Sequence, residues 1–83
     1  MIEKDKFVPS NIFDLLFYLD LLHVRYFIER CSDNGITVFI ASPGKRMEIE
    51  CFSNGKFEIA LFTGEELTDM SITEALDDIS KDM

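Results

Sequence analysis

Between Ile36 and Phe62, apolar residues recur at about every second position, and two turn sequences interrupt this pattern. A period of two is typical of a β-strand with one buried face, because successive side chains point to opposite sides of the sheet. The interruptions are Ser42-Pro43-Gly44-Lys45 and Ser53-Asn54-Gly55, and each favours a tight reversal of the chain. The segment therefore predicts three consecutive antiparallel strands, with the 46–52 strand in the centre.

The register of these strands follows from the requirement that apolar residues face apolar residues across each turn. Around the Pro-Gly turn, this requirement pairs Val38 with Ile49. At the second turn, a two-residue loop would place Cys51 against Glu58 and mix core with solvent residues, whereas a three-residue loop with a left-handed glycine pairs Ile49 with Ile59. The predicted core face consists of Ile36, Val38, Ile40, Met47, Ile49, Cys51, Phe57, Ile59 and Leu61.

A long helix is predicted before the strands. Ser10 is a good N-cap, and the chain from Asn11 to about Ser32 contains no Pro or Gly until Asn34-Gly35 provides a typical helix stop. At 100° per residue, the apolar side chains of this helix form two stripes, of which one packs on the sheet and the other needs a second cover. The first stripe is Leu15, Leu19, Leu22 and Tyr26, and the second is Phe17, Leu21, Val24, Ile28 and Cys31.

A short helix is predicted at the C-terminal end, to about Lys81. Ser71-Ile72-Thr73-Glu74 has the pattern of a capping box, and apolar residues follow it at helical spacing. We expect this helix to cover the second stripe of the long helix, and a second copy of the protein is the alternative cover. The predicted fold class is therefore α+β in the order α-β-β-β-α: a long N-terminal helix packed on a three-stranded antiparallel meander, with a short C-terminal helix, in a single domain over residues 1–83.

The balance of charge argues against several kinds of ligand. The chain of 83 residues has 16 Asp and Glu against 8 Lys and Arg, a net charge of −8. Nucleic-acid phosphates and anionic membranes both attract basic surfaces, so we expect no nucleic acid and no membrane as a partner. The most apolar stretch, 12–28, is interrupted by charged residues and no signal peptide is readable, which predicts a cytoplasmic protein.

The sequence offers no set of residues for catalysis. His23 is the only histidine, which leaves little for a metal site with two imidazoles or for a Ser-His-Asp triad. Cys31 and Cys51 are expected to be reduced thiols in an unexported chain. No calcium-loop spacing and no glycine-rich phosphate loop is present. We therefore expect a protein that is not an enzyme, with no catalytic residues, no cofactor and no metal ion.

The sheet face away from the long helix carries the features that bear on function. The register places Glu50 directly opposite Glu58, which is a destabilising pairing of like charges, and Glu48 lies nearby on the central strand. Phe39 and Phe62 border these carboxylates. A cationic protein surface suits such a cluster, because arginine pairs with carboxylates and stacks on aromatic rings. These five residues are the predicted partner-binding site, and the alternatives are an ordinary solvated face or one over which the C-terminal segment folds.

The hairpin from Pro43 to Phe62 combines a Pro-Gly turn, the strand Glu48-Ile49-Glu50, an Asn-Gly turn and a further strand with an acidic residue. In these features it resembles the hairpin of short bacterial proteins of the immunity type. The resemblance implies a small cytoplasmic protein that binds and neutralises a cognate toxin. It transfers no binding residue to this chain.

Three functions fit these features. The leading one is a small acidic inhibitor that binds a basic protein, namely an immunity protein that neutralises a nuclease-like toxin with a positive nucleic-acid groove. The second is a DNA-mimic inhibitor of a phage or mobile element, which needs carboxylates in a long band. The third is a non-enzymatic oligomeric structural module, and the chain could be a monomer or a homodimer through the long helix. If the sheet face does not bind the partner, the remaining candidate is the acidic C-terminal helix with Glu74, Asp77, Asp78 and Asp82.

Overall fold

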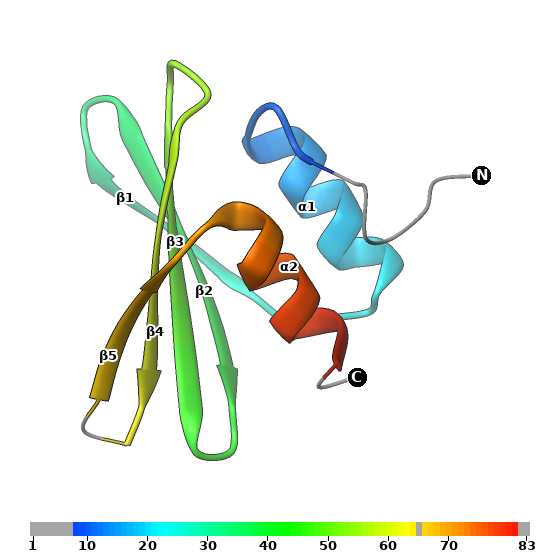
Figure 1. Cartoon of the computed structure of the whole chain (residues 1–83). Helices are drawn as coiled ribbons and strands as arrows, with labels where there is room; N and C mark the ends of the chain where they lie inside the picture. The colour runs from blue at the N-terminus through cyan, green and yellow to red at the C-terminus, as the bar shows by residue number, and fades with distance from the viewer. Residues whose placement is uncertain (1–7, 65, 82–83) are drawn as a thin grey trace.

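The computed structural model describes residues 8–64 and 66–81. Five strands form one antiparallel sheet, and their order across the sheet is their order in the sequence. A helix precedes the strands and another follows them, and both lie on the same face of the sheet (Figure 1). The elements are α1 (Ile12–Leu21), β1 (Phe27–Ser32), β2 (Gly35–Ser42), β3 (Lys45–Phe52), β4 (Phe57–Thr63), β5 (Glu66–Met70) and α2 (Ile72–Lys81).

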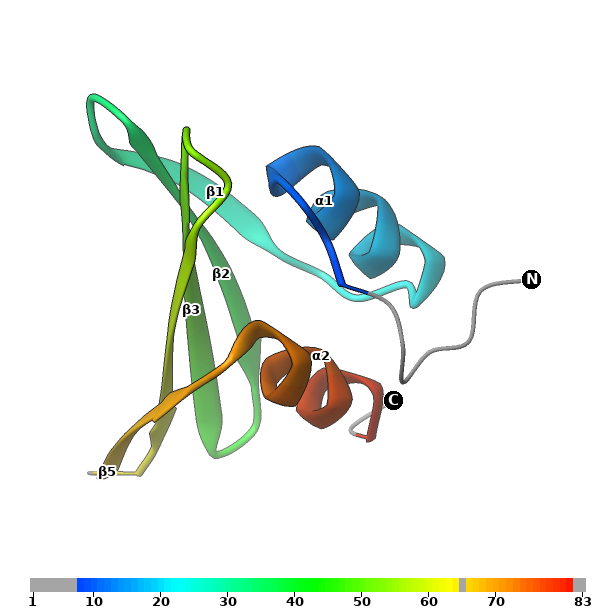
Figure 2. The ribbon, with the colours of Figure 1, turned by 45° about the horizontal axis from the view of Figure 1, so that its top comes forward.

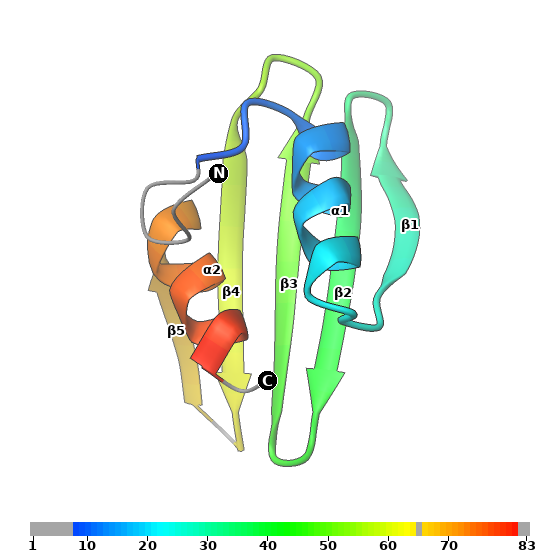
Figure 3. The same cartoon turned by 90° about the vertical axis from the view of Figure 1, so that its right-hand side faces the viewer.

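The core lies between the sheet and the helices. Seen from the helical side, α1 crosses in front of β2 and β3, and α2 crosses in front of β4 and β5 (Figure 3). Each helix therefore covers a different half of the sheet. The largest fully buried side chains come from both helices and from strands β2 and β3: Leu15, Leu19, Ile49, Leu76 and Val38.

The predicted register of the three middle strands is confirmed. Val38 pairs with Ile49, and Ile49 pairs with Ile59. The second turn has the predicted three-residue loop, because the N–H of Phe52 donates to the carbonyl of Lys56 at 2.9 Å and Gly55 has φ of +88°. All nine predicted core-face residues point toward the helices, and the five among them that are buried are Val38, Met47, Ile49, Cys51 and Ile59.

The predicted long helix is wrong. Helix α1 ends at Leu21, and residues Phe27–Ser32 form the edge strand β1. The helix stops in a Schellman arrangement: the N–H of Val24 donates to the carbonyl of Leu19 and that of His23 to Asp20, both at 3.1 Å. His23 adopts the left-handed conformation, with φ of +58°, that this motif requires. The stop therefore lies about ten residues before the expected one.

The N-terminal cap of α1 lies one residue later than predicted. Asn11 is the N-cap, and its side chain accepts a hydrogen bond from the N–H of Asp14. Ser10 instead donates to the Asp14 carboxylate from its N–H at 3.0 Å and its hydroxyl at 2.6 Å. These hydrogen bonds hold the pKa of Asp14 below its usual value.

The three-stranded sheet and the expected role of the C-terminal helix are also corrected. The segment after Gly64 forms the fifth strand, β5, which is absent from the predicted order α-β-β-β-α. The capping box of α2 is present, with reciprocal hydrogen bonds of 3.2 Å between Ser71 and Glu74. However, α2 packs over β4 and leaves Phe17 and Leu21 of the second stripe each 59% exposed. The stripe is therefore not covered by the C-terminal helix.

Candidate functional site

The sheet face opposite the helices is here named the open face. None of the described elements packs over it, as the views from two directions show (Figures 1 and 2). The alternative in which the C-terminal segment folds over this face does not hold for the chain as far as Lys81, because α2 lies on the other side. Strand alternation and register place fourteen side chains on the open face: Phe27, Glu29, Thr37, Phe39, Ala41, Arg46, Glu48, Glu50, Phe52, Glu58, Ala60, Phe62, Leu67 and Asp69.

Carboxylates gather on β3, β4 and β5 of the open face. Glu50 lies directly opposite Glu58, as predicted, and Glu48 lies two residues away on the same strand. Asp69 reaches the same area from β5, across Ala60. Within residues 8–64 and 66–81, neither Glu50 nor Glu58 forms an ion pair. Their like charges therefore face each other at cross-strand distance without a cation between them.

Arg46 shows how this face holds a cationic side chain. Its Nε lies 3.2 Å from a carboxylate oxygen of Glu48, and its guanidinium carbon lies 4.6 Å from the centre of the Phe62 ring. The arginine thus uses a carboxylate and an aromatic ring together, which is the combination predicted for an arginine of a partner. The two residues that Arg46 contacts, Glu48 and Phe62, belong to the predicted site.

Apolar side chains border the carboxylates on two sides. Phe39 and Phe62, which belong to the predicted site, are half-buried. Phe27 pairs with Phe39 across the edge of the sheet and is 74% exposed, and Leu67 pairs with Phe62 and is 60% exposed. Phe27 and Leu67 were not predicted from the sequence, because they lie on the two edge strands, which the predicted fold lacks. Large exposed apolar side chains beside a polar cluster are typical of protein-binding surfaces.

A shallow hollow of about 540 Å³ lies within the carboxylate area. The small side chain of Ala60 stands between Glu48 and Asp69 in one cross-strand row. Glu50 and Glu58 stand in the next row, beside the buried Thr37. The hollow is lined by four carboxylates and is wide enough for a protruding cationic side chain.

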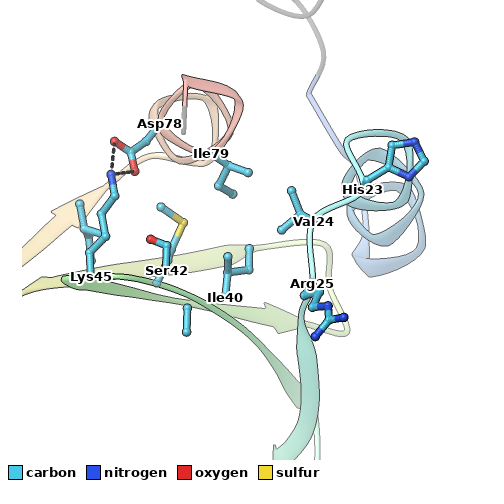
Figure 4. Close-up of a pocket in the computed structure, with 11 residues that line it drawn as sticks. His23, Val24, Arg25, Ile40, Ser42, Lys45, Asp78 and Ile79 are labelled. Carbon is cyan, nitrogen blue, oxygen red and sulfur yellow. Dashed lines mark hydrogen bonds and ion pairs between the residues drawn. The ribbon is translucent and has the colours of Figure 1, made fainter. Parts of the chain in front are cut away.

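A second pocket, of about 150 Å³, lies on the helical side between α2 and the connection from α1 to β1 (Figure 4). Its lining is mainly apolar, with an ion pair of 3.2 Å between Lys45 and Asp78 at one side. His23 points away from the apolar floor of the pocket, and Cys51 does not line it. The pocket therefore does not bring His23 and Cys51 together.

The acidic residues of α2 are engaged within the chain. Glu74 accepts the capping hydrogen bond from Ser71, Asp77 pairs with Lys81 at 3.0 Å, and Asp78 pairs with Lys45. The fourth acid of that candidate surface, Asp82, lies outside the described residues. Glu50 and Glu58 of the open face, which form no ion pair within the described residues, are therefore the better candidate for a cationic partner.

Other kinds of site find no support in the described part of the chain. No group of three or more His, Cys, Asp or Glu side chains in it is placed to hold a metal ion. Neither described helix has the length and apolar character needed to cross a membrane. Comparisons with protein families, with curated proteins and with solved structures found no match to this chain.

Proposed function

We propose that this protein is an immunity-type inhibitor that binds a basic protein, namely a nuclease-like toxin, through the open face of its sheet. The carboxylates of Glu48, Glu50 and Glu58 would pair with arginine or lysine side chains of the partner. Phe39 and Phe62 would pack against the aliphatic and guanidinium parts of those side chains. Occupation of a positive nucleic-acid groove by this face would block access of the toxin to its substrate.

The observation that carries this proposal is the direct pairing of Glu50 with Glu58. Like charges opposite each other on neighbouring strands destabilise a sheet by a few tenths to about 1 kcal/mol. The free protein gains nothing from this pairing, since neither carboxylate has a cation partner among the described residues. A cation that arrives from a partner would remove the repulsion, so the unfavourable term in the free protein would become a gain on binding.

The arrangement of the acids favours a protein-binding inhibitor over a DNA mimic. The carboxylates on β3, β4 and β5 form a compact group that surrounds Ala60, and aromatic side chains border it. A mimic of a phosphate backbone would need a longer band of charges, and it would have no use for exposed Phe27 beside Phe39.

The test replaces Glu48, Glu50 and Glu58 together by Gln and measures binding by calorimetry. The probe is the protein encoded by the neighbouring gene, in a catalytically inactive form if it is toxic. We expect the affinity to fall by tens to thousands of fold, about 2 to 4 kcal/mol, because charge-assisted contacts are lost. The association rate should fall most at low salt, where charge steers the encounter.

The matched control removes the same number of charges away from the open face, through Asp33→Asn, Glu66→Gln and Asp77→Asn. These side chains are exposed and lie in a turn, on the other side of β5 and on α2. The control should retain most of the affinity, since only long-range attraction is weakened. Equal affinity of the wild type and the open-face variant would contradict the proposal, and so would an equal loss in both variants.

A further inference from the structure

Arg46 of β3 projects from the open face, within the site proposed for a basic partner. Its Nε lies 3.2 Å from a carboxylate oxygen of Glu48, and its guanidinium carbon lies 4.6 Å from the centre of the Phe62 ring. These are the contacts proposed for an arginine of the partner. We infer that Arg46 fills this subsite in the free protein and that an arginine of the partner displaces it on binding. This exchange rests on the proposed function, because it takes place within the same site.

The subsite has room for one guanidinium group at a time. Phe62 lies directly opposite Arg46 on β4, and Glu48 lies two residues further along β3. With Arg46 in place, Phe62 is half-buried and the side chain of Glu48 is 31% exposed. An arginine that stacks on a ring covers the ring face on which it lies. A second guanidinium group therefore reaches both residues only after Arg46 has moved.

The surroundings of Arg46 allow it to move without a change in the backbone. Its side chain is 55% exposed, so its ion pair with Glu48 is a weak surface contact. On the side away from Phe62, its cross-strand neighbour is Ala41 of β2, which is small and exposed. Rotation of the side chain between staggered rotamers can turn the guanidinium group from the Phe62 ring to the space above Ala41.

The exchange favours arginine over lysine in the partner. An arginine replaces both contacts that Arg46 gives up, the ion pair with Glu48 and the stacking on Phe62. A lysine offers a compact charge without a planar group, so it replaces the ion pair but not the stacking. Arg46 therefore acts as an internal competitor that lowers the affinity for all cations and excludes lysine from this subsite.

The first test measures the binding of a hexa-arginine peptide by calorimetry in about 0.15 M salt. Arg46→Gln should bind the peptide about 3- to 30-fold more tightly than the wild type, because an exposed ion pair and a cation–π contact no longer have to be broken. The matched control is Lys81→Gln, which removes one positive charge from α2 on the other side of the sheet. It should change the affinity by at most about twofold, since distant charges are screened at this salt concentration.

The second test uses the wild type and depends on no variant that might fail to fold. In an NMR spectrum of the free protein, the ring of Phe62 should shift the δ-protons of Arg46 upfield, and Phe62→Leu should abolish this shift. Saturation with hexa-arginine should move these resonances to the position of a solvated arginine. Saturation with hexa-lysine should leave them in place.

Three results would overturn the exchange: equal effects of Arg46→Gln and Lys81→Gln, weaker binding by Arg46→Gln, or Arg46 resonances that hexa-arginine leaves in place. The variant with Glu48, Glu50 and Glu58 changed to Gln separates this failure from failure of the proposed function. If that variant loses affinity for hexa-arginine while the wild-type Arg46 resonances do not move, only the exchange is wrong. If it binds as tightly as the wild type, the open face is not the binding surface, and both proposals are wrong.

Discussion

Cys51 lies on the core face of the central strand, where its side chain is 4% exposed. Its thiol lies 3.7 Å from the carbonyl of Ile49, to which it can donate a weak hydrogen bond. Burial, with a smaller contribution from the charge of Glu50, raises the pKa of this thiol from 9.0 to about 11. The residue therefore acts as a small apolar side chain of the core and holds almost no thiolate near neutral pH.

This environment predicts an unreactive thiol. In a Cys31→Ser variant, a disulfide reagent at pH 8 should modify Cys51 at least about a hundredfold more slowly than a free cysteine, because the thiolate fraction falls with the raised pKa. Modification should become complete when urea unfolds the protein. Rapid and complete modification of the native variant would show that Cys51 is accessible.

The same shift gives a pH dependence with a defined sign. The folded protein keeps the proton on Cys51 up to about pH 11, whereas the unfolded chain releases it near pH 9.0. The contribution of the protonated Cys51 thiol to the free energy of unfolding is complete below pH 9 and is lost as pH rises toward 11. The measurement is the free energy of unfolding as a function of pH. A Cys51→Ala variant should lack the part of the alkaline decline in this free energy that Cys51 causes.

At the level of elements, the end of α1 determines the architecture, because the chain can return as strand β1 only if the helix ends at Leu21. The left-handed conformation at His23 costs a non-glycine residue about 1 to 2 kcal/mol. Two backbone hydrogen bonds and the packing of Val24 against the core offset this cost.

His23→Gly should therefore stabilise the protein. Glycine adopts the left-handed conformation without strain, although its unfolded chain has more freedom, so the expected net gain is about 0.5 to 1 kcal/mol. In thermal unfolding this corresponds to a rise of roughly 2 to 8 °C for a domain of this size. His23→Ala, which keeps the strain, is the control and should not raise the melting temperature. A glycine variant no more stable than the alanine variant would argue against a strained helix end.

The sequence predicts the middle of the sheet well because its signals there are local. Two turn sequences with glycines at left-handed positions, together with strict alternation, leave one register in which apolar residues face each other. The pairing of Glu50 with Glu58, and with it the centre of the candidate site, follows from that register alone. The capping box of α2 is equally local.

The edge strands could not be predicted on the same basis. The helix stop at His23 contains no glycine or proline, so the apolar residues from Val24 to Ile28 also fitted a helical period. In β5 the apolar residues are Leu67 and Met70, which point to opposite faces and so give no alternation. These two segments become strands because β1 pairs with β2 and β5 pairs with β4, which are contacts that local sequence does not reveal. The edges of the open face, with Phe27, Leu67 and Asp69, were missed for this reason.

At the scale of the whole molecule, charge and apolar surface are separated on two sides. The open face concentrates carboxylates around a hollow, and the outward side of α1 exposes an uncharged stripe. A partner on one side therefore leaves the other accessible.

The net charge of −8 on 83 residues should make the stability of the protein depend on salt. Like charges repel in the compact state, and salt screens this repulsion, with a Debye length that falls from about 30 Å at 0.01 M to about 10 Å at 0.1 M. The melting temperature should therefore rise by several degrees between about 10 and 200 mM NaCl.

If the carboxylates of the open face dominate the repulsion, the variant with Glu48, Glu50 and Glu58 changed to Gln should be more stable than the wild type at low salt and less responsive to salt. The control variant neutralised at Asp33, Glu66 and Asp77 has the same net charge as the open-face variant. If the salt dependence of its melting temperature changes less than that of the open-face variant, the repulsion lies mainly on the open face. If both variants change equally, the repulsion is spread over the whole surface.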